Sequence, residues 1–147
     1  MFFTHIILPL ILWKLFGNFW FLMVGSMIVD IDHLFLLIKN KHFNLREAVD
    51  VLKNEEKYGE HYRSPYLHSF FGLIVTSLLV WLFFSPTGAV YWAIGYLTHL
   101  IIDLFDKDVQ YLLFPLKIEF KGTLPIPSYV EFTIAGFFLT ILIIISF

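Results

Sequence analysis

The sequence predicts an all-α, integral-membrane helical bundle of four to five transmembrane helices. Hydrophobic residues make up 59% of the 147-residue chain and charged residues only 15%, whereas soluble domains are about 45–50% apolar and about 25% charged. The hydrophobic residues also gather in five runs, separated by turns and polar stretches. A soluble fold of this size would leave much of this apolar surface in water, so we expect lipid to cover it.

The apolar runs define the predicted helices. They cover residues 2–15, 19–38, 66–84, 89–105 and 129–147. Because a helix needs about 20 residues to cross the hydrocarbon core, the last four runs reach or approach the required length and the first is short. The first run lacks a basic flank and a cleavage site, which favours a retained membrane helix over a signal peptide. Turns at Gly17-Asn18 and Ser85-Pro86-Thr87-Gly88 predict that the first four runs form two antiparallel hairpins.

Two polar stretches separate the hairpins and the last helix. Residues 39–65 form a hydrophilic loop, in which Leu45 to Lys57 are expected to make a short surface helix. At its end, Ser64 as N-cap and Pro65 at the first helical position predict the start of the next helix. Residues 106–128 are also polar and contain three prolines. We expect residues 1–147 to form a single membrane-embedded domain.

Histidine and aspartate lie inside two of the predicted membrane helices, in Asp30-Ile31-Asp32-His33 and at His99 and Asp103. Ionisable side chains are costly in hydrocarbon, so they are rare there and usually functional. Asp30 and His33 are three positions apart and His99 and Asp103 four, so each pair shares a helix face. Imidazole and carboxylate bind divalent metals. Since the chain has no cysteine, we expect zinc, with manganese or iron as alternatives.

The two predicted hairpins bring further polar residues to the same height. His5 lies 12 residues before the turn glycine of the first hairpin, and Asp30 lies 13 after it. In the second hairpin, His68 lies 18 residues before the turn proline and Asp103 lies 17 after it. At 1.5 Å per residue, these side chains should lie roughly 18–27 Å from the turns, near one face of a ~30 Å core.

The charged residues are distributed very unequally between the two faces. All twelve acidic residues, and nine of the ten lysines and arginines, fall on the side of the candidate ligands, and Lys14 alone lies near the other face. By the positive-inside rule, the candidate site, the N-terminus and the loop 39–65 are cytoplasmic. We therefore expect a multi-pass protein of the cell (inner) membrane. The net charge of −2 argues against a nucleic-acid partner.

The predicted metal ligands come from four helices: His5, Asp30, His33, His68, His99 and Asp103. A lone histidine such as His5 is more often a hydrogen-bonded core residue than a metal ligand. The position of His5 opposite Asp30 favours the ligand role. Asp32 and Asp106 are either further ligands or carboxylates that orient a ligand histidine. A hydrolytic metal takes three or four protein ligands, so this set suits one to three ions.

Other polar residues approach the same face. Arg63 is suited to clamp a phosphate or carboxylate, helped by free N–H groups at the predicted helix start, and it is alternatively a headgroup-level arginine. His61 approaches the same face, whereas His42 is expected at the surface. Glu131 is either a further carboxylate of the site or a partner of the helix dipole. Asp32, Arg63 and Asp106 are the expected catalytic residues.

Several segments resemble the pattern of a known family. They are Thr4-His5, Asp30-Ile31-Asp32-His33, His68-Ser69, Gly95-Tyr96-Leu97-Thr98-His99-Leu100-Ile101-Ile102-Asp103, Leu113-Phe114-Pro115 and Glu131. Over nearly its whole length the chain is similar to the YdjM-type membrane-bound metal-dependent hydrolases, which distantly resemble the zinc phospholipase C and single-strand nuclease superfamily. It departs from the family pattern His-Arg-Gly-x-Thr-His-Ser at residues 61–69, which are two residues longer and lack the Gly and Thr.

The resemblance implies a hydrolytic metal centre in a helical membrane protein and supplies little about the substrate. A site at headgroup depth favours a phospholipid or lipid-linked phosphoester, with membrane lipids as partners; the oligomeric state stays open. Two other classes are also open. A metal-ion binding or transport protein without hydrolytic activity should offer polar residues on the opposite side too. A structural metal protein should have a site closed entirely by protein ligands.

Overall fold

The structure is a computed structural model, which describes residues 2–41, 44, 50–51, 63–124 and 129–146. The predicted surface helix in 45–57 lies outside these residues except for helical Asp50 and Val51, and His42 and His61 also lie outside them. The described chain is mostly helical, which confirms the predicted helical class.

The first two apolar runs form the predicted hairpin. Helix α1 (Phe2–Phe16) is followed by Gly17 and Asn18, whose φ angles are 78° and 54°. Glycine and asparagine tolerate this left-handed conformation better than other residues, so the reversal is encoded locally. The second run is α2 (Phe19–Met27), a 3₁₀ turn η1 (Ile28–Asp30) and α3 (Ile31–Lys39). The change of helix type falls at Asp30, and such mid-helix turns often mark functional positions.

The second hairpin is formed by α6 (Phe70–Phe83) and α7 (Pro86–Asp103). Ser85 caps α7 by accepting a hydrogen bond from the Gly88 N–H, at 2.9 Å, so the turn residues also begin the helix. The predicted start of α6 at Ser64 is wrong. Ser69 is the N-cap, and its Oγ accepts from the Gly72 N–H.

Ser64 begins a short turn before α6 and also has a tertiary partner. The Ser64 N–H donates to the Asp32 carboxylate at 2.6 Å, and residues 64–69 form turns. Within these turns the His68 N–H donates to the Ser64 carbonyl at 2.9 Å. The Ser64 Oγ accepts from the Tyr66 N–H at 3.2 Å, so Ser64 caps this short turn and not α6, while its own N–H is held by Asp32 of α3.

The stretch after α7 contains a strand pair that the sequence pattern did not predict. Strand β1 (Val109–Gln110) pairs antiparallel with β2 (Phe120–Lys121). The last helix, α8 (Tyr129–Ile144), follows the predicted final run. The strand pair bears on the candidate ligands because Gln110, at the end of β1, is buried and contacts Asp103.

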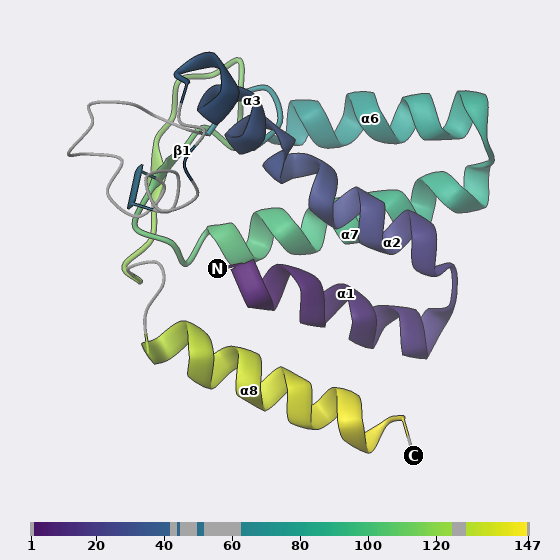
Figure 1. The fold of residues 1–147 in the computed structure, drawn as a ribbon. Helices are drawn as coiled ribbons and strands as arrows, with labels where there is room; N and C mark the ends of the chain where they lie inside the picture. Colours follow the sequence, from purple (N-terminus) through teal and green to yellow (C-terminus); the bar gives the residue numbers. More distant parts are fainter. Residues whose placement is uncertain (1, 42–43, 45–49, 52–62, 125–128, 147) are drawn as a thin grey trace.

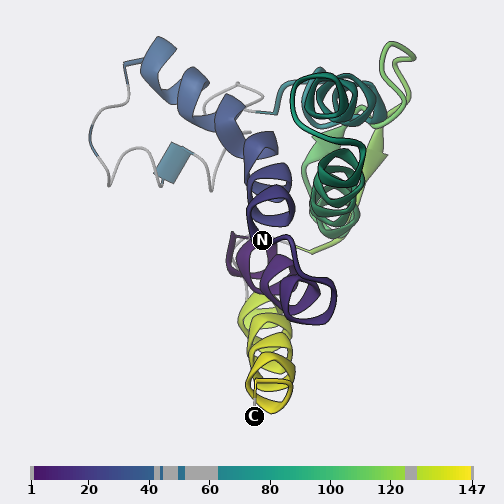
Figure 2. The same cartoon turned by 90° about the vertical axis from the view of Figure 1, so that its right-hand side faces the viewer.

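Figure 1 shows α1, α2, α6 and α7 running side by side, with both tight turns at one end and α3 and β1 at the other. Helix α8 packs along α1 at the edge of the bundle (Figure 2). Helices α2 and α7 approach closely because Gly95 faces the backbone of Leu22, where an added Cβ would overlap the Leu22 carbonyl. The buried core near the site includes Val29 and Tyr96.

Among the described residues, one helical stretch, Phe19–Lys39, is long and apolar enough to cross a membrane by length and composition. The helical stretches Thr4–Phe16, Phe70–Phe83 and Tyr129–Ile144 are apolar but shorter. Large apolar side chains cover the outside of the bundle, for example Trp20 at 74% and Phe83 at 77% exposure. Such extensive exposed apolar surface is typical of proteins covered by lipid or by a partner.

Candidate metal centre

The six predicted metal ligands all lie together at the end of the bundle opposite the tight turns. With Asp32 they form three overlapping groups, in each of which the potential ligand atoms lie within 4.8 Å of one another: His5 with His99 and Asp103, Asp30 with His68 and His99, and Asp32 with His33 and His68. They come from α1, η1, α3, the turns before α6, and α7. The equal heights predicted from the hairpins are therefore seen in the structure.

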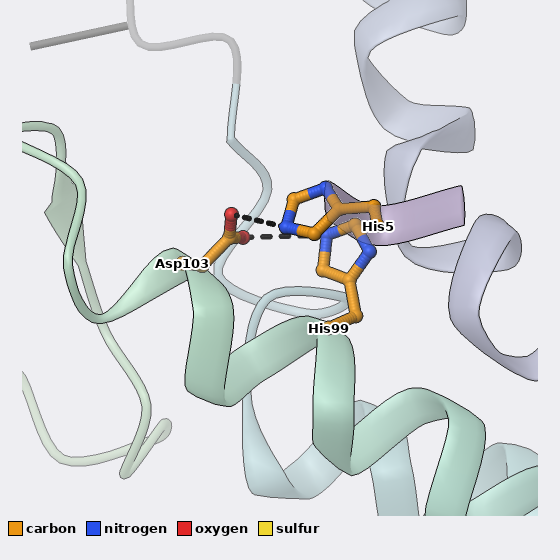
Figure 3. A group of neighbouring side chains, drawn as sticks. All are labelled: His5, His99 and Asp103. Atoms are coloured by element: carbon orange, nitrogen blue, oxygen red, sulfur yellow. Dashed lines mark ion pairs between the residues drawn. The ribbon is translucent and has the colours of Figure 1, made fainter. Parts of the chain in front are cut away.

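Asp103 faces the imidazoles of His5 and His99 from one side, with an ion pair to each (Figure 3). Its Oδ1 is 3.3 Å from His5 Nε2, and its Oδ2 is 3.3 Å from His99 Nε2. The two imidazole rings are stacked, with 3.8 Å between their centroids. Asp103 is at the last position of α7 and His99 is one turn earlier, so the helix itself fixes their mutual position, whereas His5 arrives from α1.

Asp30 completes the contact between the hairpins. Its carboxylate oxygens lie 3.9 Å from His5 Nδ1, 3.5 Å from His99 Nε2 and 3.6 Å from His33 Nε2. Asp30 is also the most exposed of these residues, with 35% of its side chain accessible. The group is therefore reached from the outside at Asp30 and is buried at His99 and Asp103.

His68 is oriented by a carboxylate from another helix. Asp32 Oδ2 lies 3.0 Å from His68 Nδ1, and the other ring nitrogen of His68 lies 3.5 Å from Asp103 Oδ2. A carboxylate on one imidazole nitrogen commonly orients the other nitrogen toward a metal. Of the two roles predicted for Asp32, this contact matches the orienting one, while its Oδ1 has no hydrogen-bond partner among the described residues.

The residues present fit a divalent metal. Several buried polar atoms lack a hydrogen-bond partner in the described part of the chain, including His5 Nε2, His68 Nε2, His99 Nε2 and both carboxylate oxygens of Asp103. An unsatisfied buried polar group costs about 1–3 kcal/mol, so a shared ligand for these atoms would stabilise the fold. Imidazole nitrogens and carboxylate oxygens are the donors that zinc, manganese and iron accept.

Arg63 lies beside the ligand groups rather than at a free surface. Its Nη2 is 2.5 Å from Asp106 Oδ2, 3.6 Å from Asp103 Oδ1 and 3.7 Å from Asp108 Oδ2. Burial disfavours the charged guanidinium, but these carboxylates outweigh it and raise the pKa of Arg63. Arg63 therefore stays positively charged. Its Nε and Nη1 are buried without a hydrogen-bond partner among the described residues.

Asp106, which was expected to be a ligand or to orient a histidine, forms its close contact with Arg63. It lies beyond the end of α7 and is fully buried. Burial raises the pKa of Asp106 to about 6, although the neighbouring Arg63 acts in the opposite direction. Glu131 is buried at the start of α8 and belongs to none of the three ligand groups formed by described residues.

Two residues that hold the backbone at the candidate ligands were not predicted from the sequence. The Tyr96 hydroxyl donates to the Leu67 carbonyl, directly before His68. The Gln110 side-chain amide donates to the Asp103 carbonyl at 2.5 Å. Tyr96 carries a sequence signal, because it precedes His99 by one helical turn in the Gly95–Asp103 motif. Gln110 carries none, since its position depends on the unpredicted strand pair.

The helical fold and the buried histidine–aspartate cluster define a class, a mostly helical protein with a large exposed apolar surface and a candidate metal centre. A family model described as YdjM inner membrane protein matches residues 1–146, and the chain therefore belongs to this family. The match confirms the family predicted from the motifs and indicates an inner membrane protein. No curated protein and no solved structure matches the chain.

Proposed function

We propose that this protein is a membrane-bound metal-dependent hydrolase that acts on a phospholipid or lipid-linked phosphoester at the cytoplasmic membrane interface. The observation that carries the proposal is the convergence, from separate helices, of buried imidazole and carboxylate atoms that have no hydrogen-bond partner among the described residues. Zinc is the first candidate metal, with manganese or iron as alternatives, and the three overlapping ligand groups allow one to three ions.

The balance of charge at the centre supports a bound cation. Five aspartates contact four histidines and one arginine there: Asp30, Asp32, Asp103, Asp106 and Asp108 with His5, His33, His68, His99 and Arg63. Among the described residues of this group, the Arg63 guanidinium is the one permanently positive side chain for five carboxylates. Buried charge without compensation is strongly destabilising, and divalent cations would supply the missing positive charge.

The proposed topology is a bundle of four to five transmembrane helices with the site on the cytoplasmic side. It is supported by the side-by-side arrangement of the two antiparallel hairpins, α1–α2 and α6–α7 (Figure 1), and by their exposed apolar surface. The distribution of lysine and arginine, with Lys14 alone near the tight turns, supports the orientation. Helices shorter than about 20 residues are accommodated by local thinning of the bilayer or by polar flanks at the headgroups.

The roles of the residues follow from their contacts. A divalent metal held by these ligands supplies water activation near neutral pH and polarisation of a phosphoryl or acyl oxygen. Asp103 holds His5 and His99 in place, and Asp32 orients His68. Arg63 offers its unpaired Nε and Nη1 donors to a phosphoryl oxygen, while Asp106 fixes the guanidinium. A carboxylate that is not a ligand can accept the proton of the attacking water.

Elemental analysis and a substrate screen test the proposal. The protein, purified in detergent, is analysed for zinc, manganese and iron and then assayed on phospholipids and phosphodiesters. We expect bound metal and hydrolysis in the wild type, and reduced metal content with loss of hydrolysis in His99→Ala, since His99 belongs to two of the three ligand groups. The control is Lys117→Gln, which alters an exposed charged side chain between β1 and β2, outside the centre and the cavity lining. Full metal content and undiminished hydrolysis in His99→Ala would overturn the proposal, and bound metal without hydrolysis would favour a metal-binding or transport protein.

A further inference from the structure

A cavity of about 730 Å³ opens directly beside the metal centre. Its apolar wall is formed by side chains of α3, of the turns before α6 and of the β1 region: Ile31, Phe35, Pro65, Tyr66, Leu67, Val109 and Tyr111. Its polar lining is Asp32, Arg63 and Ser64. Because Asp32 contacts His68, the cavity and the ligand groups share a wall. Its size lies within the range of about 300–1,000 Å³ that is typical of ligand sites.

Arg63 gives this cavity a place for an anion. Its side chain is only 7% exposed, and Nη2 alone faces the three carboxylates. The Nε and Nη1 donors are buried and have no partner within the described chain. Two unused donors on a permanently charged group, at the border of an apolar cavity, match the phosphoryl group of an amphiphile.

The apolar wall suits a hydrocarbon tail better than a polar headgroup. Ile31 and Phe35, at 50% and 66% exposure, lie on α3 at the end of the apolar stretch Phe19–Lys39. The cavity is therefore bordered by the surface that the proposed topology places against lipid. A tail can enter it sideways from the bilayer without crossing water, so that only the phosphoryl group has to reach the metal centre.

We propose that the cavity holds one hydrocarbon chain of a phosphoryl-bearing lipid, with Arg63 Nε and Nη1 binding a phosphoryl oxygen. The inference rests on the proposed function, because it assigns the substrate's tail and anion to a cavity beside the proposed hydrolytic site. It makes α3 and the β1 region the elements that select the tail. It also distinguishes a lipid substrate from a free phosphate or a headgroup alone, neither of which would fill the apolar part.

Photolabelling of the purified full-length protein in detergent tests this assignment. The probes are octyl phosphate with a diazirine at the chain end and the corresponding octanol, and labelled positions are mapped by mass spectrometry. We expect octyl phosphate to label the lining residues Ile31, Asp32, Phe35, Ser64 to Leu67, Val109 and Tyr111, and octanol to label them weakly. Ile31→Trp on α3 and Val109→Trp on β1 each add bulk to the cavity lining and should each reduce this labelling roughly tenfold, as expected for overpacking a site.

Leu34→Trp is the matched control, because Leu34 is 58% exposed on the same helix and does not line the cavity. It should label as the wild type does. Labelling spread evenly over the apolar helices, equal labelling by octanol, or unchanged labelling in both cavity-filling variants would overturn the assignment. The readout needs no turnover. A protein that labels in the cavity without hydrolysing lipids refutes the proposed function alone, and one that hydrolyses lipids without this labelling refutes the tail site alone.

Discussion

His68 Nδ1 lies 3.0 Å from Asp32 Oδ2, although the two residues belong to different hairpins. The same carboxylate oxygen accepts a hydrogen bond from the Ser64 N–H at 2.6 Å. Asp32 therefore fixes both the backbone turns before α6 and the ring orientation of His68. One charged side chain joins the two halves of the bundle at the metal centre.

Replacing Asp32 by asparagine should weaken metal binding. The amide would keep the size of the side chain but lose the charge that orients and polarises His68. Loss of such a carboxylate commonly lowers metal affinity about 10–100-fold. Titration with a metal-buffered chelator measures the change, and Lys117→Gln, outside the centre, should bind as the wild type. Unchanged affinity in Asp32→Asn would show that the contact has no part in metal binding.

Removing the metal should lower the thermal stability of the protein. Without a cation, the neighbouring aspartates repel one another, and both Asp103 oxygens lack a hydrogen-bond partner among the described residues. A ligand present at 100 times its Kd stabilises the folded state by about 2.7 kcal/mol. We expect chelation to lower Tm in detergent by several degrees and added zinc to restore it, with both effects reduced in His99→Ala. Equal Tm values before and after chelation of the wild type would contradict the prediction.

Gly95→Ala should separate α2 from α7 and disturb the centre from a distance. The new methyl group would overlap the Leu22 carbonyl, and overpacking of this kind costs about 1–3 kcal/mol. Since Asp30 follows α2 and His99 lies on α7, their 3.5 Å contact should lengthen and metal affinity should fall.

Gly136→Ala is the control for this change, because an added Cβ there meets nothing within 4 Å. It lies within α8, where alanine favours a helix over glycine by up to about 1 kcal/mol. We expect its Tm to be unchanged or slightly raised and its metal affinity to be unaltered. Equal effects of the two substitutions on Tm would refute the close approach of α2 and α7.

Arg63 and Asp106 should be energetically coupled. Arg63→Met leaves the buried Asp106 carboxylate without its partner, and breaking such a pair costs about 3–5 kcal/mol. Adding Asp106→Asn removes the orphaned charge and should restore part of the stability. A double-mutant cycle on thermal unfolding, at equal metal saturation, measures the coupling, and additive effects would show that the 2.5 Å contact contributes nothing.

The orientation in the membrane can be tested cleanly because the chain has no cysteine. Thr87→Cys lies at the end with the tight turns, and Lys117→Cys lies in the segment between β1 and β2; both positions are exposed. A membrane-impermeant maleimide should label Thr87→Cys in cells with a permeabilised outer membrane. Lys117→Cys should react only after the inner membrane is opened. The reverse pattern would place the metal centre on the other side of the membrane.

The helical class, the family and the set of candidate ligands could all be predicted from the amino-acid sequence. So could the shared height of His5, Asp30, His68 and Asp103. The physical reason is that these features are local. Apolar runs set helix lengths, Gly17 and Pro86 mark the reversals, and a constant rise per residue converts sequence distance into height.

The pairing of the polar side chains, in contrast, depends on the tertiary structure. The Asp32 carboxylate accepts from the Ser64 N–H, and Arg63 lies among three aspartates. Gln110, in the strand pair, donates to the Asp103 carbonyl. The contacts of Asp32 and Arg63 join segments that are far apart in sequence, and several partners were available to each charged group. Only the packing of the helices selects among them, because burial makes each unpaired charge costly.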